Sequence, residues 1–200
     1  MKFALIGAGG HAKSVVDILL ALLLELDCYV SPRSEAWLNV RHLVDESPLA
    51  GTGLAVAMGL GGVEPAQLER RLVLLDGLLR SGLAAPPLVH PSATISPSAT
   101  LGAGVIVMPG AIVNANARLD RGVIVNSRAV VEHDAEIGAG SHVAPGAIVL
   151  GAARLGQSCM IGASAVILQS AAVPDQGFVR AVSLYRGDAS NTERQRHEVR

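Results

Sequence analysis

Two histidines in the second half of the chain could do acid–base chemistry. His133 is followed directly by Asp134, and His142 lies nine residues further on. A neutral imidazole has a pKa of about 6.5, so near neutral pH it can accept a proton from an attacking amine or hydroxyl. A neighbouring carboxylate can orient the ring and stabilise its protonated form. His133 and Asp134 are therefore a candidate general base and partner; an exposed histidine without function is the alternative that the spacing leaves open.

A glycine-rich segment near the N-terminus could hold an anion. The run Gly7-Ala8-Gly9-Gly10-His11-Ala12-Lys13 follows a short apolar strand and precedes a helical pattern. Strand, glycine turn and helix in this order present backbone N–H groups and a helix N-terminus to a negative charge. The spacing differs from the dinucleotide fingerprint GxGxxG. A tight turn without a ligand is the other interpretation.

A repeat of six residues must position the histidines. Over residues 93–182 the third place of every block is Ile, Leu or Val. Such a short fixed period is typical of a solenoid in which each block is one strand and one corner. Three blocks close a triangular coil, and coils stack at the sheet spacing of about 4.8 Å. The unbroken register argues against a sandwich, which needs turn signals at longer intervals. The pattern predicts a parallel β-helix.

The first third of the chain has another pattern. We expect strands over residues 3–6, 27–30 and 54–58 and a helix over residues 65–80, which together make a small Rossmann-like βαβ unit of the α/β class. The expected domains are this unit at residues 1–83, the β-helix at 84–182 and a flexible charged tail at 183–200.

Composition excludes several classes of protein. The 200-residue chain has a formal net charge of −1 and no long basic stripe, so nucleic acid is not an expected partner. The longest apolar stretch, residues 15–26, contains Asp17 and Glu25 and is too short to span a membrane. No signal peptide is visible, and the two cysteines, Cys28 and Cys159, lie in different segments. A reduced, cytoplasmic protein is the simplest interpretation.

Four segments together carry a resemblance to a known family. They are Gly7 to Lys13, Leu88-Val89-His90-Pro91-Ser92-Ala93, Val131-Glu132-His133-Asp134 and Ser141-His142-Val143-Ala144-Pro145-Gly146. In combination they resemble the sugar O-acyltransferases, which include sialic-acid O-acetyltransferases and N-acetyltransferases of nucleotide-linked amino sugars. The resemblance implies a left-handed β-helix, a homotrimer with active sites between subunits, and acetyl-CoA lying along the coil. No metal is expected, because no third histidine lies within the blocks beside His133 and His142.

The resemblance also implies roles for single residues. His133 would be the general base and Asp134 its acidic partner. His142 would be a second active-site histidine near the acetyl group or the substrate, and Asn126 would face the substrate. The positions expected to contact the coenzyme are His142, Gly151, Gly162 and Ala163. The positions expected to hold the nucleotide diphosphate are Gly7, Gly9, Gly10 and His11.

The chain departs from the family pattern in three places. Val30 is followed by Ser31-Pro32-Arg33, where the family usually has acidic residues, and Gly59-Leu60-Gly61-Gly62 stands where it commonly has Gly-Asp-Asn. The repeat also fades after Val182, where the family continues with further blocks.

The resulting hypothesis is an acetyltransferase that moves the acetyl group of acetyl-CoA to the amine of a nucleotide-linked amino sugar for surface glycan synthesis. Transfer to a sugar hydroxyl is an alternative, because one base serves both reactions. A non-catalytic scaffold is another. A zinc-dependent γ-type carbonic anhydrase on the same coil is a further alternative. It needs three zinc-binding histidines, and the absence of a third histidine within the blocks disfavours it.

Overall fold

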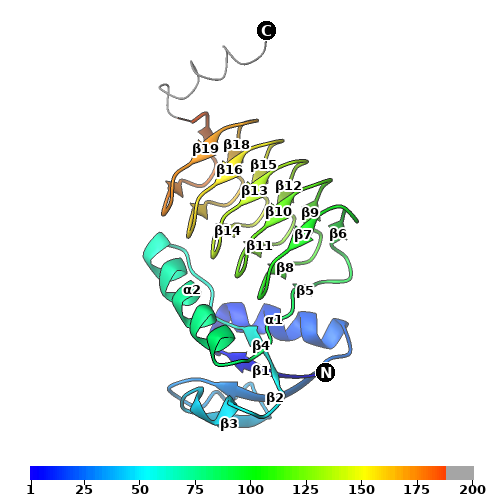
Figure 1. The fold of residues 1–200 in the computed structure, drawn as a ribbon, viewed down its shortest axis with the longest axis vertical. Helices are drawn as coiled ribbons and strands as arrows, with labels where there is room; N and C mark the ends of the chain where they lie inside the picture. Colours follow the sequence, from blue (N-terminus) through cyan, green and yellow to red (C-terminus); the bar gives the residue numbers. More distant parts are fainter. Residues whose placement is uncertain (188–200) are drawn as a thin grey trace.

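A computed structural model of the chain describes residues 1–187 (Figure 1). The N-terminal unit is a four-stranded parallel sheet in the order β3-β2-β1-β4. Its strands are β1 Lys2–Ile6, β2 Glu25–Val30, β3 Arg41–Leu43 and β4 Ala55–Met58. Its helices are α1 Gly10–Ala21 and α2 Pro65–Arg80, with a short 3₁₀ turn, η1, at Ser47–Leu49.

Most elements expected in this unit are confirmed. The helix over residues 65–80 coincides with α2, and the strands over 27–30 and 54–58 correspond to β2 and β4. Strand β3 was not expected from the sequence, because it has three residues, none of them buried. Helix α1 begins at Gly10, so His11 lies in its first turn and not in the preceding loop.

The rest of the described chain is a parallel β-solenoid whose strands have two residues each. Its first face holds β5 Leu88–Val89, β8 Ile106–Val107, β11 Ile124–Val125, β14 His142–Val143, β17 Met160–Ile161 and β20 Phe178–Val179. Its second holds β6 Thr94–Ile95, β9 Ile112–Val113, β12 Val130–Val131, β15 Ile148–Val149, β18 Val166–Ile167 and β21 Leu184–Tyr185. Its third holds β7 Thr100–Leu101, β10 Arg118–Leu119, β13 Glu136–Ile137, β16 Arg154–Leu155 and β19 Ala172–Val173.

The expected parallel β-helix is confirmed, and the repeat explains it. Each strand pairs with the strand eighteen residues later, as Val125 does with Val143, so three blocks make one coil. The third-place residues from Val107 to Val179 point inward and form one continuous aliphatic core. The handedness stays a prediction of the resemblance.

The coil extends beyond the expected boundary at residue 182. Strand β21 pairs with β18 through Leu184 and Tyr185, so residues 183–185 belong to the coil and not to a tail. The sequence concealed this block because Tyr185 occupies the third place, where every earlier block has Ile, Leu or Val. The remainder of the expected tail, residues 188–200, lies outside the described residues.

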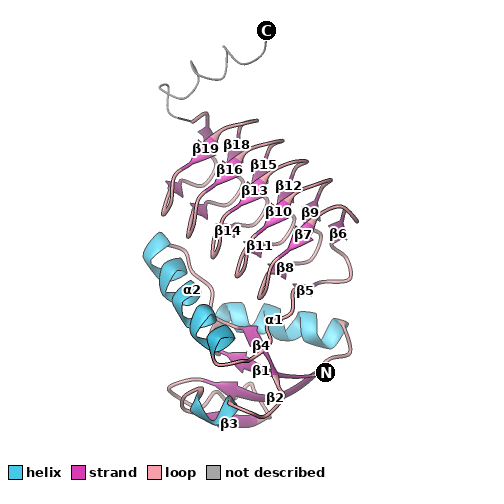
Figure 2. Ribbon diagram, viewed as in Figure 1, coloured by secondary structure: helices cyan, strands magenta, loops and turns pink. Residues whose placement is uncertain are grey.

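The first face is covered by the N-terminal unit, and we call it the covered face. Its outward residues Ile106, Ile124, His142 and Met160 are buried, whereas Phe178 in the last strand of this face is exposed. Helix α2 lies along the neighbouring corner of the coil (Figure 2), where one glycine per coil, Gly104, Gly122 and Gly140, has a positive φ. A Cβ on Gly140 would come within 3.0 Å of Leu72 on α2, so the missing side chain lets the helix approach closely.

The other two faces differ sharply from each other. The second, the aliphatic face, presents a row of half-buried side chains that no element of residues 1–187 covers: Ile112, Val130, Ile148 and Val166. The third, the charged face, presents Arg118, Glu136 and Arg154 at the same places, with Glu136 between the two arginines at 4.0 and 3.7 Å. Within residues 1–187, no helix is long and apolar enough to cross a membrane.

Candidate active site

His133 and Asp134 lie at the corner between β12 on the aliphatic face and β13 on the charged face. The His133 Nδ1 and Asp134 Oδ2 atoms are 2.9 Å apart. Asp134 has a φ of 60°, a conformation that asparagine and aspartate tolerate better than most residues. Both side chains are more than half exposed, at 56% and 54%. The corner therefore presents the pair to solvent, as a base that must reach a substrate requires.

The hydrogen bond to Asp134 defines what His133 can do. It raises the pKa of His133, and in return it lowers the pKa of the Asp134 carboxyl. With Nδ1–H donated to an ionised carboxylate, Nε2 keeps its lone pair and can accept a proton. The arrangement has the chemistry of a general base held in one tautomer by its partner.

Asn116 holds the other oxygen of the Asp134 carboxylate. Its Nδ2 donates to Asp134 Oδ1 over 3.2 Å, and this bond is the second cause of the lowered Asp134 pKa. Asn116 is not among the site residues expected from the sequence. The available signal was its spacing, because Asn116 precedes Asp134 by eighteen residues, one full coil.

Gly151 keeps the space beside the base open. It lies one coil after His133, and a Cβ at this position would come within 2.7 Å of His133 Nε2. Any other residue would therefore contact the proton-accepting atom. The glycine leaves a gap in which a thioester or an amine can approach, so its place fits the coenzyme contact that the resemblance implies.

His142 has surroundings of another kind. It is 6% exposed on the covered face, where its Nδ1 lies 2.8 Å from Gly62 O and its Nε2 lies 2.9 Å from Asn126 Nδ2. Nδ1 therefore donates to the carbonyl, and Nε2 accepts from the amide. Burial lowers the pKa of His142, which keeps the ring neutral. Both nitrogens are engaged within the protein, and the side chain ties the loop after β4 to the coil.

The N-terminal turn combines an open backbone with a half-buried histidine whose ring turns inward. An added Cβ on Gly9 or Gly10 would meet no atom within 4 Å, so this backbone is accessible. Gly7 has a φ of +91° and packs against Leu60, where a Cβ would come within 2.5 Å. His11 instead turns inward against Gly61, and burial lowers its pKa to about 3. His11 is thus a neutral ring at pH 7.

The site residues expected from the sequence fall at two corners of the coil. His133, Asp134 and Gly151 lie between the aliphatic and charged faces, whereas Asn126, Gly162 and Ala163 lie between the covered and aliphatic faces. The missing side chain of Gly162 has a packing reason, because a Cβ there would come within 2.3 Å of the Ala181 backbone. Within a single chain, the residues of these two corners therefore lie on opposite sides of the aliphatic face.

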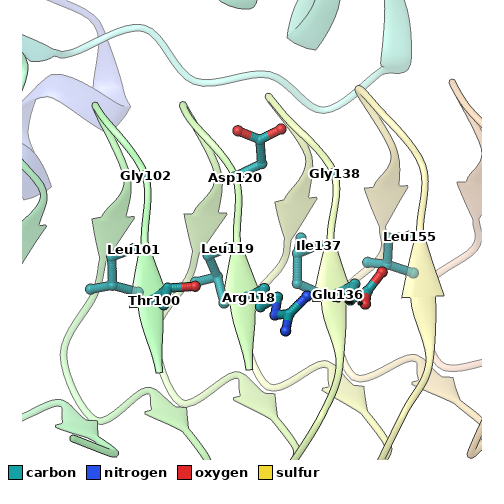
Figure 3. A pocket seen from close by; sticks show the side chains of 10 residues that line it. All are labelled: Thr100, Leu101, Gly102, Arg118, Leu119, Asp120, Glu136, Ile137, Gly138 and Leu155. Carbon is teal, nitrogen blue, oxygen red and sulfur yellow. Dashed lines mark ion pairs between the residues drawn. The ribbon is translucent and has the colours of Figure 1, made fainter. Parts of the chain in front are cut away.

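A hollow of about 490 Å³ lies on the charged face (Figure 3). Its lining residues are Thr100, Leu101, Gly102, Arg118, Leu119, Asp120, Glu136, Ile137, Gly138 and Leu155. A smaller hollow of about 290 Å³ continues toward the corner and includes Asn116 and Asp134. Sequence analysis did not anticipate this polar surface beside the His133 corner. In residues 1–187, no group of three or more His, Cys, Asp or Glu side chains could hold a metal ion.

Comparison with known proteins gives matches among solved structures. The acetyltransferase domain of PglB from Neisseria gonorrhoeae is 31% identical, with a TM-score of 0.83, over 94% of this chain and 92% of that one. The same domain in complex with acetyl coenzyme A is 31% identical, with a TM-score of 0.81, over 92% of both chains. No family model and no curated protein matches.

A variant of the perosamine N-acetyltransferase from Caulobacter crescentus, in complex with CoA and GDP-perosamine, also matches. It is 27% identical, with a TM-score of 0.85, over 94% of this chain and 90% of that one. The matches thus cover both the N-terminal unit and the coil.

Proposed function

We propose that this chain, which belongs to the family of hexapeptide-repeat sugar acetyltransferases, transfers the acetyl group of acetyl-CoA to the amine of a nucleotide-linked amino sugar. The observation that carries the proposal is the exposed His133–Asp134 pair with Gly151 beside its free nitrogen. The relatives that bind acetyl coenzyme A or GDP-perosamine support the choice of the two substrates.

In the proposed mechanism the sugar amine attacks the thioester carbonyl directly. A C–N bond forms, the C–S bond breaks, and His133 Nε2 takes the proton that the amine loses. The imidazolium then returns this proton to the departing thiolate, so the products are the acetamido sugar and free CoA. Asp134 stabilises the imidazolium, and Asn116 holds Asp134 in place.

We assign the Gly151 N–H as donor to the oxyanion. Its neighbours Leu150 and Ala152 donate to Ile167 O and His133 O, whereas the Gly151 N–H has no hydrogen-bond partner within residues 1–187. A backbone donor beside the base is suited to the charge that develops on the carbonyl oxygen. The protein then supplies position, a base and a donor, and no covalent intermediate is needed.

We also propose that the site is completed by a second copy of the chain in a homotrimer. The two corners that carry the site residues border the aliphatic face on opposite sides. A cyclic assembly through this face would bring His133 of one copy toward Asn126 of the next, a head-to-tail contact that closes into a ring. It would also cover Ile112, Val130, Ile148 and Val166. Ile148→Asp should dissociate the assembly and abolish transfer, as measured by light scattering and product formation.

The N-terminal unit, residues 1–83, is proposed to bind the nucleotide. In the order β3-β2-β1-β4 the loops after β1 and β4 diverge, which makes a switch point of the kind where open α/β sheets bind ligands. We further propose that the protein works in the cytoplasm. Its two cysteines, Cys28 and Cys159, are buried and unpaired, which fits a reducing compartment.

The proposal is tested by calorimetric titration with acetyl-CoA, followed by transfer assays with GDP-perosamine and other nucleotide amino sugars. We expect about one binding site per chain and release of the CoA thiol in step with an N-acetylated product. An acetylated hydroxyl would move the assignment to O-acetylation. Absence of acetyl-CoA binding would contradict the proposal and favour a scaffold.

A further inference from the structure

Arg71 is a buried cation that belongs to none of the groups described so far. It projects from α2 and is 2% exposed. Its Nε donates to Leu60 O over 2.8 Å, and its Nη1 donates to Gly122 O of the coil. The side chain therefore holds the loop Gly59–Gly62 against the first coils. The same loop packs on the N-terminal turn, through Leu60 on Gly7 and Gly61 on His11.

The charge of Arg71 has no counterion in this position. Among residues 1–187 no carboxylate pairs with the guanidinium, and its Nη2 has no hydrogen-bond partner. A buried cation that only two backbone carbonyls compensate is costly, because no paired anion offsets its removal from water. Helix α1 has no acidic residue in its first turn, so the partial positive charge of its N-terminus is not neutralised there either.

His11 does not supply this charge. The family resemblance implies that it helps to hold the nucleotide diphosphate, but the side chain is half-buried, and its buried Nε2 also lacks a partner within the described chain. Burial and the nearby Arg71 lower its pKa to about 3, so it is uncharged at neutral pH. Lys13 lies in the same turn of α1, but its ammonium sits over the Trp37 ring, 5.6 Å from the ring centroid.

We propose that Arg71 supplies the positive charge that attracts the diphosphate of the nucleotide-linked substrate to the switch point between β1 and β4, acting from beneath the loop Gly59–Gly62. This inference rests on the proposed function, because it concerns the same substrate. The low-dielectric surroundings strengthen the field of the charge at the loop. Where the family usually has acidic and amide side chains, this chain has Ser31 and Leu60. It would thus bind its nucleotide through the charge of Arg71 and through backbone N–H donors.

The test is calorimetric titration of the full-length protein with inorganic pyrophosphate at low and high salt. Arg71→Met keeps the length of the side chain but removes the charge, and we expect it to weaken binding about tenfold and to flatten the salt dependence. Arg71→Lys, which keeps the charge, should stay within about threefold of the wild type. Arg70→Met is the matched control, because Arg70 is an exposed residue of the same helix, and its effect should stay within about twofold.

Three outcomes would overturn the inference. Unchanged pyrophosphate binding by Arg71→Met is one, and absence of pyrophosphate binding by the wild type is another. The third is an equal loss in Leu72→Ala, which loosens α2 on Gly140 without a change of charge. Acetyl-CoA titration of each variant shows that the coil is intact, and it separates failure of this inference from failure of the proposed function.

Discussion

His133 and His142 lie nine residues apart, but the coil gives them opposite surroundings. His133 is exposed at a corner, has one carboxylate partner and a raised pKa. His142 is buried under the N-terminal unit, has both nitrogens engaged and a lowered pKa. Residue type and spacing alone therefore do not distinguish the two histidines, whereas solvent access and a free lone pair on the ring do. His133 meets both conditions and is the base in our proposal, whereas His142 joins two parts of the fold and is proposed as a positioning residue.

The largest expected effect is on catalysis at His133. His133→Ala should lower kcat/KM for acetyl transfer about a thousandfold, because a general base typically contributes between about a hundredfold and ten-thousandfold. The denaturant midpoint should stay unchanged, since the side chain packs against little. Near-normal turnover of this variant would remove His133 from the role of base.

Acid should lower the free energy of unfolding through His11 and His142. His11 and His142 have lowered pKa values in the folded chain, with that of His11 at about 3, whereas both take up protons near their ordinary value of 6.5 when unfolded. Their stabilising contribution is complete above pH 6.5 and is lost as the pH falls toward the folded values. The linkage to His11 alone should lower the free energy of unfolding by on the order of 1.4 kcal/mol for each pH unit below 6.5, until its folded pKa is reached. Urea unfolding across this range tests it; a flat profile would contradict the burial of both rings.

His142→Ala should lower the free energy of unfolding by about 1–3 kcal/mol, because Gly62 O and Asn126 Nδ2 would each lose a buried partner. Its kcat/KM should fall much less than that of His133→Ala. A variant with wild-type stability would show that the tie between the loop and the coil is not formed.

Asp134→Asn should change the pH dependence of the reaction. The hydrogen bond to Asp134 raises the pKa of His133, so the acidic limb of kcat/KM lies above the ordinary 6.5. Since the base must be unprotonated, activity falls as the pH drops through this value. Asparagine removes the effect, and the limb should move to lower pH while the rate falls about tenfold or more. An unmoved limb would contradict the pairing.

The smallest effect is expected at Asn116. Asn116→Ala should lower kcat/KM about twofold to fivefold, because it frees one oxygen of an exposed carboxylate that His133 still holds. Asn114→Ala, two residues away in the same block, is the control and should change nothing. Equal effects of the two variants would point to the corner as a whole and not to the Asn116–Asp134 bond.

The coil and the His133 corner were predictable because their determinants are local. A period of six fixed which residues point inward, and His133 is adjacent to Asp134 in the chain. Gly151, one coil away, followed from the same period. Asn116 could have been found by that reasoning, because stacked coils repeat every eighteen residues.

The surroundings of His142, His11 and Arg71 were not predictable in this way. His142 bonds to Gly62, eighty residues earlier, and Arg71 bonds to Gly122, fifty-one residues later. These contacts depend on how α2 and the loop after β4 pack against the coil, and no local sequence pattern encodes that packing. The sequence therefore indicated three histidines as candidates, and only the packing separated the exposed one from the two buried ones.

The most direct test is the dependence of kcat/KM on pH for His142→Asn beside the wild type and His133→Asn, across the titration range of histidine. We expect His142→Asn to keep the acidic limb of the wild type at a moderately reduced rate and His133→Asn to lose nearly all activity. If the limb disappears in His142→Asn and activity survives in His133→Asn, the base is the buried histidine and the proposed mechanism is wrong.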